Sequence, residues 1–146
     1  MGSVWYTEPM PTRSRSFRIE STTLESLDEA ARHGGVSANQ FAARILEEGL
    51  RMHAFPGIAF ARSQMGYRPV LAGTRLAVWE VAATLLANSG DTARTSTSLG
   101  LRPDQVGVCA RYYAAYQGEV DAYTKGLEDA AARERALHDR QHAIFS

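Results

Sequence analysis

The chain has 146 residues with 16 acidic and 16 basic side chains, so its formal net charge is zero. Apolar residues make up 45% of it, which is typical of a globular protein, and there is no run of about 18 apolar residues that would suggest a transmembrane helix. Cys109 is the single cysteine, which excludes a disulfide framework and a thiolate metal cage.

The zero net charge is the sum of basic and acidic zones along the chain. Residues 1–19 carry three arginines and one glutamate, and residues 56–118 carry six arginines and three acids. Residues 20–55 and 119–146 are acidic. All basic residues except Lys125 are arginines, whose planar fork suits phosphates and guanine edges, although a GC-rich genome also favours arginine. Overall neutrality therefore does not exclude a nucleic-acid partner.

The first predicted elements are an arm and a short strand. Residues 1–12 contain two prolines and no apolar periodicity, so we expect a flexible arm. Residues 15–20 alternate, with Phe17 and Ile19 on one side and polar side chains on the other. Because this period of two is that of a strand with one apolar face, the pattern predicts a β-strand here.

Two amphipathic helices are expected to follow this strand. The Ser-Thr-Thr run at residues 21–23 offers N-caps for the first helix, which Gly34 and Gly35 end. Ser37 is the predicted N-cap of the second helix, and Gln40 completes a capping box. The apolar stripes of the two helices comprise Leu24, Leu27 and Ala31, and then Phe41, Ala42, Ile45, Leu46 and Leu50.

The middle of the chain is expected to hold a loop and a small hairpin. Residues 53–66 are predicted to form a loop that contains a Pro-Gly turn. Short strands are predicted at residues 70–71 and 76–78, on either side of a turn at Gly73. The hairpin would present the two residues that follow this glycine, Thr74 and Arg75.

Four further helices complete the prediction. They are expected over residues 79–88, from Asp91 or Thr92 to Gly100, from Pro103 onwards, and over residues 119–138. The residues expected to face inward are Val78, Val81, Ala82, Leu85 and Leu86, then Val106, Ala110 and Tyr113, and finally Tyr123, Leu127, Ala130 and Leu137. Tyr112, Tyr116 and Trp79 are expected to be packing residues.

Residues 13–52 resemble the ribbon-helix-helix repressors. The resemblance is carried by RSFRIE at residues 15–20, GGVS at 34–37 and NQFAARIL at 39–46. One strand and two helices cannot close a core alone, so we expect a two-fold dimer with antiparallel strands, a ribbon that fits the major groove. The resemblance implies base contacts by Ser16 and Arg18. The full set of predicted DNA-binding residues is Arg13, Arg15, Ser16, Arg18, Ser37, Ala38 and Asn39, of which the last three would hold a phosphate.

Residues 56–121 resemble a second family, a small bacterial domain marked by a Gly-Thr-Arg signature. The resemblance is carried by PVLAGTRLAVWEV at residues 69–81, LGLRPDQV at 99–106 and RYYAAY at 111–116. The family implies a winged-helix or helix-turn-helix-like fold. It commonly occurs as the antitoxin beside a PIN-like ribonuclease toxin, as in VapB-like antitoxins. The predicted fold class is therefore mainly α, with a ribbon-helix-helix module before this domain.

No catalytic set stands out in the sequence. His138 and His142 lie one helical turn apart, but no further ligand completes a metal site. Cys109 falls on a predicted helix without a nearby histidine, so we expect a small buried side chain rather than a nucleophile. We expect neither an enzyme nor a cofactor.

The sequence thus predicts a cytoplasmic, dimeric antitoxin without a secretory signal or membrane segment. Its parts would be an arm (1–12), a DNA-binding and dimerisation module (13–55), the signature domain (56–121) and a C-terminal helix and tail (122–146). It would repress its own operon at operator DNA and neutralise a PIN-like ribonuclease. The candidate toxin-binding residues are Arg75, Arg133, Arg135, Arg140 and Phe145, with Ile144 as a further apolar anchor. The alternatives are a stand-alone regulator, a dimerisation adaptor that does not bind DNA, and a tail that only packs in a dimer.

Overall fold

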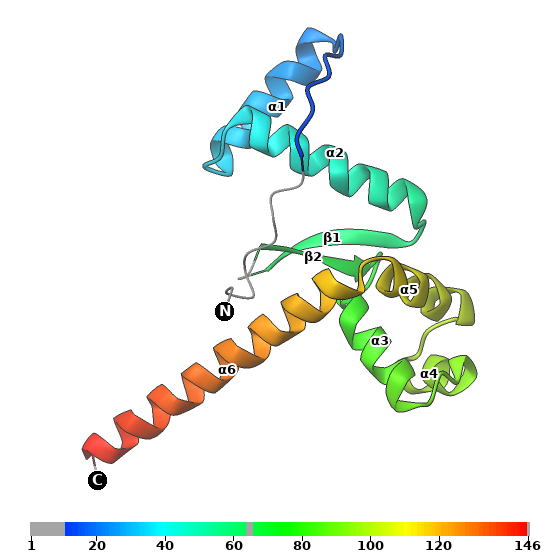
Figure 1. The fold of residues 1–146 in the computed structure, drawn as a ribbon, viewed down its shortest axis with the longest axis vertical. Helices are drawn as coiled ribbons and strands as arrows, with labels where there is room; N and C mark the ends of the chain where they lie inside the picture. The colour runs from blue at the N-terminus through cyan, green and yellow to red at the C-terminus, as the bar shows by residue number, and fades with distance from the viewer. Residues whose placement is uncertain (1–10, 64–65, 146) are drawn as a thin grey trace. The chain divides into compact units, whose positions relative to one another are not determined.

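The computed structural model of the chain describes residues 11–63 and 66–145, and it is mainly helical, as predicted (Figure 1). Among these residues, the elements are α1 (Ser21–His33), α2 (Ala38–Ala54), β1 (Ile58–Ser63), β2 (Gly66–Leu71), α3 (Val78–Ala87), α4 (Thr92–Leu99), α5 (Pro103–Ala115) and α6 (Gln117–Phe145). None of the helices described is long and apolar enough to cross a membrane. Most of the predicted arm, residues 1–10, lies outside the described residues.

Contacts divide the chain into two compact units, Met1–Arg44 and Ile45–Ser146. The boundary falls inside α2, whereas the sequence placed a domain boundary at residues 55 and 56. The N-terminal unit therefore holds α1 and the first turns of α2, and the C-terminal unit holds the rest of α2 and all later elements.

The strand predicted over residues 15–20 is not formed in the single chain. Residues 11–20 belong to no helix or strand. The physical reason is that a strand is defined by its pairing, and this segment was expected to pair with the same segment of a second copy. The backbone enters α1 from an extended conformation at Glu20, with φ −59° and ψ 145°.

The ends of α1 confirm one prediction and correct another. The predicted N-caps at residues 21–23 are wrong, because they lie inside the helix and Glu20 is the N-cap residue, without a side-chain cap. The backbone carbonyl of Glu20 accepts the N–H groups of Thr23 and Leu24, both at 3.1 Å, so the helix begins earlier than expected. Gly35, with φ 66°, ends the turn after α1 as predicted.

The predicted capping box at the start of α2 is confirmed. The Ser37 hydroxyl accepts a hydrogen bond from the backbone N–H of Gln40 at 3.1 Å. The Gln40 side-chain oxygen accepts one from the backbone N–H of Ser37 at 3.4 Å. This reciprocal pair fixes where α2 begins, since it satisfies two N–H groups at the helix start.

The hairpin of the C-terminal unit differs from the predicted one. Part of the predicted loop over residues 53–66 is in fact β1, which pairs antiparallel with β2 from Ile58↔Leu71 to Ser63↔Gly66. The predicted strand partner at residues 76–78 contributes only a single bridge, Val70↔Ala77. β1 pairs with β2 over six residues, whereas the short segment after Gly73 could pair over only two or three. The longer pairing therefore forms in place of the predicted one.

A core cluster lies in the C-terminal unit between the hairpin and α3, α5 and α6. Of the residues predicted to face inward, Val78, Val81 and Val106 are buried, but Leu86 is 66% exposed and that prediction is wrong. On α5 the fully buried ring belongs to Tyr112, and Tyr113 is half-buried. The buried cluster comprises Ile58, Leu71, Val78, Val81, Val106, Val108, Cys109, Tyr112 and Val120.

The caps of α4 and α5 follow the local sequence. The Asp91 carboxylate accepts a hydrogen bond from the backbone N–H of Arg94 at 3.0 Å, which confirms the predicted N-cap of α4. Gly100 ends α4 in the left-handed conformation, with φ 66°. Pro103 occupies the first turn of α5, where its missing N–H costs nothing.

The last helix, α6, is longer than the predicted range of residues 119–138. Its first half packs on the core through Val120 and Gly126. From Ala132 to Phe145 every side chain is exposed, including Leu137, which was expected to face inward. In Figure 1 this distal half of α6 runs away from α3 and α5.

Candidate functional site

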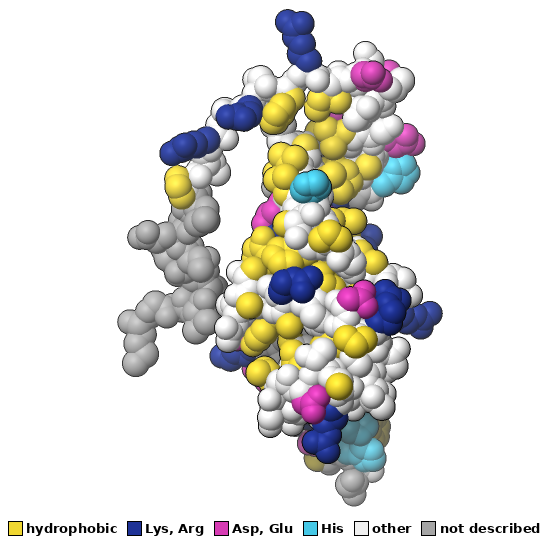
Figure 2. All heavy atoms as spheres, turned by 90° about the vertical axis from the view of Figure 1, so that its right-hand side faces the viewer, with side chains coloured by type: hydrophobic (Ala, Val, Ile, Leu, Met, Phe, Trp, Pro, Cys, Tyr) yellow, Lys and Arg dark blue, Asp and Glu magenta, His cyan; other side chains and the backbone are white. Residues whose placement is uncertain are grey.

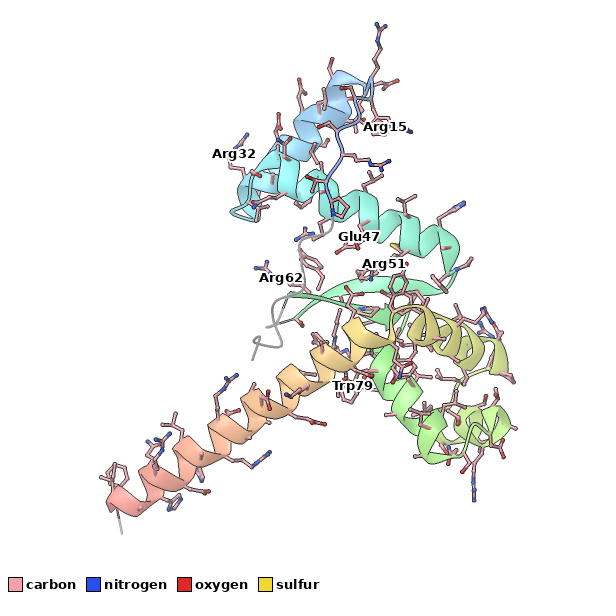
Figure 3. The ribbon with its side chains drawn as sticks, in the orientation of Figure 1. Arg15, Arg32, Glu47, Arg51, Arg62 and Trp79 are labelled. Carbon is pink, nitrogen blue, oxygen red and sulfur yellow. The ribbon has the colours of Figure 1, made fainter. Side chains whose placement is uncertain are left out.

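The predicted DNA-reading segment is exposed along its whole length. Every residue from 11 to 20 is exposed, including Arg13, Arg15, Ser16 and Arg18. Figure 2 shows basic side chains spaced along the segment that leads into the first helix, and Arg15 is labelled on it in Figure 3. The structure therefore leaves these side chains accessible to a ligand, with none of them buried in the fold.

The same segment also exposes large apolar side chains. Phe17 is 65% exposed and Ile19 is 47% exposed. They alternate with Ser16 and Arg18, and successive side chains of an extended backbone point to opposite sides. An extended segment here would thus present one apolar face and one basic, polar face.

The N-terminal unit has almost no interior of its own. Among its described residues, 11–44, only Ala31 is buried. Leu24 of α1 and Val36 of the following turn are exposed together with Phe17 and Ile19. Figure 2 shows hydrophobic side chains on the surface of this unit. Because so little apolar surface is removed from water, the unit lacks the main driving force for folding as an isolated body.

The start of α2 places the predicted phosphate-binding residues at a helix N-terminus. The backbone N–H of Ser37 donates to the Gln40 side chain at 3.4 Å, and the Ser37 hydroxyl accepts from the N–H of Gln40 at 3.1 Å. Phosphate contact by Ser37 stays a prediction. Ala38 and Asn39 are the first residues of the helix, where backbone N–H groups have no acceptor within the helix itself. The positive end of the helix dipole favours an anion at this position.

The predicted turn at Gly73 forms in the Gly-Thr-Arg loop, but Thr74 is bonded into the turn and only Arg75 is presented. Gly73 has φ 77°, a left-handed conformation that suits glycine. The Thr74 hydroxyl donates to the carbonyl of Leu71 at 2.8 Å and accepts from the N–H of Leu76 at 3.1 Å, so Thr74 holds the turn together. Arg75 is exposed. The loop therefore presents an arginine on a turn that the threonine fixes.

The start of α5, which follows the turn after α4, carries a paired arginine. Arg102 precedes α5, and its guanidinium pairs with Asp104 at 3.1 Å. The hydrogen bond to Arg102 holds the pKa of Asp104 below its usual value, so this carboxylate is charged at neutral pH. A negative charge in the first turn of α5 disfavours a phosphate there. The helix-turn-helix-like assignment stays a prediction.

The predicted toxin-binding residues on α6 are exposed. Arg133 and Arg140 are seven residues apart and share one side of the helix, whereas Arg135 lies on another side. Phe145 is 83% exposed at the end of the helix, next to the exposed Ile144. The distal half of α6 thus combines cations with apolar anchors on a surface that nothing in this unit covers.

A charged network around Arg51 was missed from the sequence. Arg51 donates to Glu47 at 2.6 Å, to Glu119 at 2.6 Å and to the Tyr112 hydroxyl at 2.9 Å. Its guanidinium also lies 4.0 Å from the centroid of the Tyr116 ring. Figure 3 labels Arg51 and Glu47, which lie one turn apart on α2. The Glu47–Arg51 spacing was a readable signal, but Glu119 lies far along the chain.

Burial would by itself lower the pKa of Arg51, but its hydrogen bonds to Glu119 and Tyr112 raise that pKa overall. The guanidinium is therefore a fixed charge, stacked on a ring and held by two carboxylates. Its side chain is only 14% exposed, whereas those of Glu47 and Glu119 are largely exposed. The network ties the C-terminal half of α2 to α5 and α6.

The remaining reactive groups have unremarkable surroundings. Cys109 is buried as predicted, and burial raises the pKa of its thiol to about 11, so it is not a thiolate at neutral pH. The rings of His138 and His142 lie 5.0 Å apart. Within the described ranges, no group of three or more His, Cys, Asp or Glu side chains could hold a metal ion.

No protein-family model, curated protein or solved structure matches the chain. The likeness to ribbon-helix-helix repressors and to Gly-Thr-Arg antitoxins therefore stays a prediction, and it rests on the residues described above.

Proposed function

We propose that the chain is a dimeric DNA-binding repressor that also serves as an antitoxin. The observation that carries the proposal is the N-terminal unit, in which an exposed segment with alternating apolar and basic side chains precedes two helices that bury only Ala31. An apolar surface of this kind is covered most economically by a second copy of the same unit.

In the proposed dimer, residues 15–20 of two copies pair as antiparallel strands. This pairing supplies the strand partner that the single chain lacks, and it covers Phe17 and Ile19 on the inner face. Ser16 and Arg18 then face outward on a two-stranded ribbon, which fits the major groove of B-DNA. Arg18 would donate two hydrogen bonds to guanine, and Ser16 would bond to either base type.

Contacts to the DNA backbone would position this ribbon. Arg13 and Arg15 supply positive charge beside it, and Ser37, Ala38 and Asn39 offer a phosphate site at the start of α2. Because the chain as a whole is neutral, affinity would depend on these few groups rather than on bulk charge.

Replacing Arg18 by alanine tests the ribbon. DNA sites would first be selected from a random duplex pool with the natural chain, and affinities then measured by fluorescence anisotropy at several salt concentrations. We expect Arg18→Ala to weaken binding by about 5- to 150-fold, the equivalent of about 1–3 kcal/mol, and to relax preference at one base pair.

The matched control is Arg32→Ala, which removes the same charge from the exposed end of α1. We expect it to change affinity by less than about threefold, with base preference intact, since it lies away from the ribbon. Equal losses for the two variants, or none for Arg18→Ala, would contradict base reading by the strand.

The antitoxin part of the proposal is supported by the Gly-Thr-Arg resemblance and by the exposed distal half of α6. A PIN-like ribonuclease has an acidic active site, which cations on a helix would complement. We place Arg133 and Arg140 against those carboxylates, with Phe145 and Ile144 as apolar anchors and Arg135 and Arg75 as further contacts. Occupation of the active site by the helix would then block RNA.

Deleting residues 133–146 tests this assignment, with the product of the neighbouring reading frame as the partner. Since these side chains are exposed, we expect DNA affinity and thermal stability to stay within measurement error. Inhibition of the ribonuclease should require at least about tenfold more protein, because the deletion removes the proposed hot-spot residues. Unchanged inhibition by the truncated chain would show that this segment is not the blocking element.

A further inference from the structure

A pair of histidines lies on the exposed distal half of α6. His138 and His142 are four positions apart, so they lie on the same side of the helix, one turn from each other. Both side chains are exposed. Their ring centroids are 5.0 Å apart, and the ring planes are inclined by 66° to each other. The fold thus brings two imidazoles together at a surface where one ligand can reach both.

The distance between the two rings matches that of imidazoles which share a metal ion. An imidazole nitrogen binds Zn²⁺ at about 2.0–2.1 Å, which places the ring centroid about 3.2 Å from the ion. Two such ligands that make an angle between about 90° and 109° at the ion have centroids about 4.5–5.2 Å apart. The observed 5.0 Å falls within this range. Both rings can therefore bind one ion after side-chain rotation alone, with the helix backbone unchanged.

The donor atoms determine which ions this pair would bind. Imidazole suits Cu²⁺, Ni²⁺ and Zn²⁺, whereas Mg²⁺ and Ca²⁺ prefer oxygen ligands. Two histidines at positions i and i+4 are also the spacing by which one helix of a zinc protease holds its metal. In the described part of the chain, no third His, Cys, Asp or Glu side chain completes a metal-binding group. Water would therefore fill the remaining positions, and the pair would form an open chelate rather than a closed structural site.

Carboxylates beside the pair favour a cation. Glu134 lies one turn before His138, and both of them line a shallow surface depression together with Asp139 and Arg135. Two carboxylates and one guanidinium give this depression a net negative charge, which attracts a cation. A carboxylate near a metal-bound histidine also accepts the N–H of the second ring nitrogen, which orients the ring and makes it a better ligand. Glu134 is placed for this role, since residues four apart on a helix are neighbours.

We propose that His138 and His142 bind one divalent first-row transition ion, with water as the remaining ligands. The imidazole donors set the order of affinity: Cu²⁺ binds most tightly, Ni²⁺ and Zn²⁺ bind more weakly, and Mg²⁺ and Ca²⁺ do not bind measurably. Because the ion holds two side chains one helical turn apart, it stabilises the last turns of α6 against fraying. Neither histidine belongs to the contacts proposed for DNA or the toxin, and Arg133 and Arg140 lie on the other side of α6.

Titration of the ¹⁵N-labelled full-length chain with ZnCl₂ tests the site. The imidazole ¹⁵N signals of His138 and His142 should shift together and saturate at one ion per chain. The signals of His33 and His53, which are also exposed, serve as internal controls and should not change. We expect calorimetric titration to give a lower dissociation constant for CuCl₂ than for ZnCl₂, and no binding of MgCl₂ up to about 1 mM.

Two results of the titration would overturn the proposal. Equal shifts of all four histidines would show adventitious binding of the ion to single imidazoles. Saturation at half an ion per chain would show that two copies share the ion, so that water does not complete the site.

An exchange of two neighbouring residues tests the spacing at constant composition. His142→Ala combined with Ala143→His places the second imidazole about 140° around the helix from His138. We expect zinc affinity to fall at least about tenfold, because the two ligands can no longer act on one ion. The matched control is His53→Ala, which removes a histidine outside the pair and should change the affinity by less than about twofold.

The variants should fold, because all the substituted side chains are exposed, and circular dichroism checks this. Zinc binding by the exchanged chain as tight as that by the natural chain would contradict chelation by the pair. An equal loss of affinity in His53→Ala would contradict it as well.

Discussion

Replacing Tyr112 by alanine is expected to lower the free energy of unfolding of the C-terminal unit by about 3–5 kcal/mol. The ring is fully buried in the core cluster. It contacts the rings of Phe55 and Tyr116, with centroids 5.3 Å and 4.8 Å away, and its hydroxyl accepts a hydrogen bond from Arg51. Truncation would leave a cavity and deprive Arg51 of a partner. Urea unfolding followed by circular dichroism gives the measurement.

Two further variants separate the contribution of the buried Tyr112 ring from that of its hydroxyl and from that of the adjacent Tyr113. Tyr112→Phe keeps the ring and removes only the acceptor for Arg51, so we expect a loss of about 1–2 kcal/mol. Tyr113→Ala removes a half-buried ring whose hydroxyl donates to Asp121 at 2.8 Å, and should cost about 1 kcal/mol. If Tyr113→Ala were as damaging as Tyr112→Ala, the assignment of Tyr112 to the core would be wrong.

Leu24→Asp should convert the proposed dimer to a monomer and abolish the proposed specific DNA binding. Leu24 is an exposed apolar residue of the N-terminal unit that the proposed dimer covers. Two-fold symmetry would place a carboxylate on each copy in an apolar interface, and the desolvation cost of each is several kcal/mol. We expect the dimer dissociation constant to rise more than about 100-fold, as measured by analytical ultracentrifugation.

Thr22→Asp is the control for this change. Thr22 lies on the same helix and is also exposed, but it is polar and in the first turn of α1, where a negative charge is favourable. We expect this variant to remain dimeric and to bind the selected DNA with an affinity within about threefold of the natural chain. A monomeric Leu24→Asp chain that still bound the DNA with full affinity would separate dimerisation from DNA reading and contradict the ribbon.

Features set by neighbouring residues could be predicted from the sequence. The Ser37–Gln40 capping box, the Asp91 cap, the Gly100 terminus and the Pro103 start depend on side chains within four positions of one another. Even there, the N-caps predicted at residues 21–23 placed the start of α1 one to three residues too late, because Glu20 is the N-cap. Amphipathic spacing identified α3, but it could not decide that Leu86 would lie outside the core.

Features set by distant pairing could not be predicted in the same way. The sequence missed β1, because the Ala residues that alternate with Ile58 and Phe60 give a weak strand signal. Arg51 meets Glu119 from 68 positions away, and only the packing of α2 beside α5 and α6 brings them together. The predicted ribbon depends on a second copy, so one chain alone cannot form it.

The Arg51 network also determines where segments of this chain could be exchanged with segments of another protein. Exchange of segments between proteins at residues 55 and 56, where motif boundaries suggest a natural junction, would separate Arg51 from Glu119 and Tyr112. A recipient of residues 56–146 would inherit a buried tyrosine hydroxyl without its donor. A transferable C-terminal segment must instead begin at Ile45 and include the second part of α2. The first part of α2 belongs with the N-terminal unit, so α2 is not a linker between two domains.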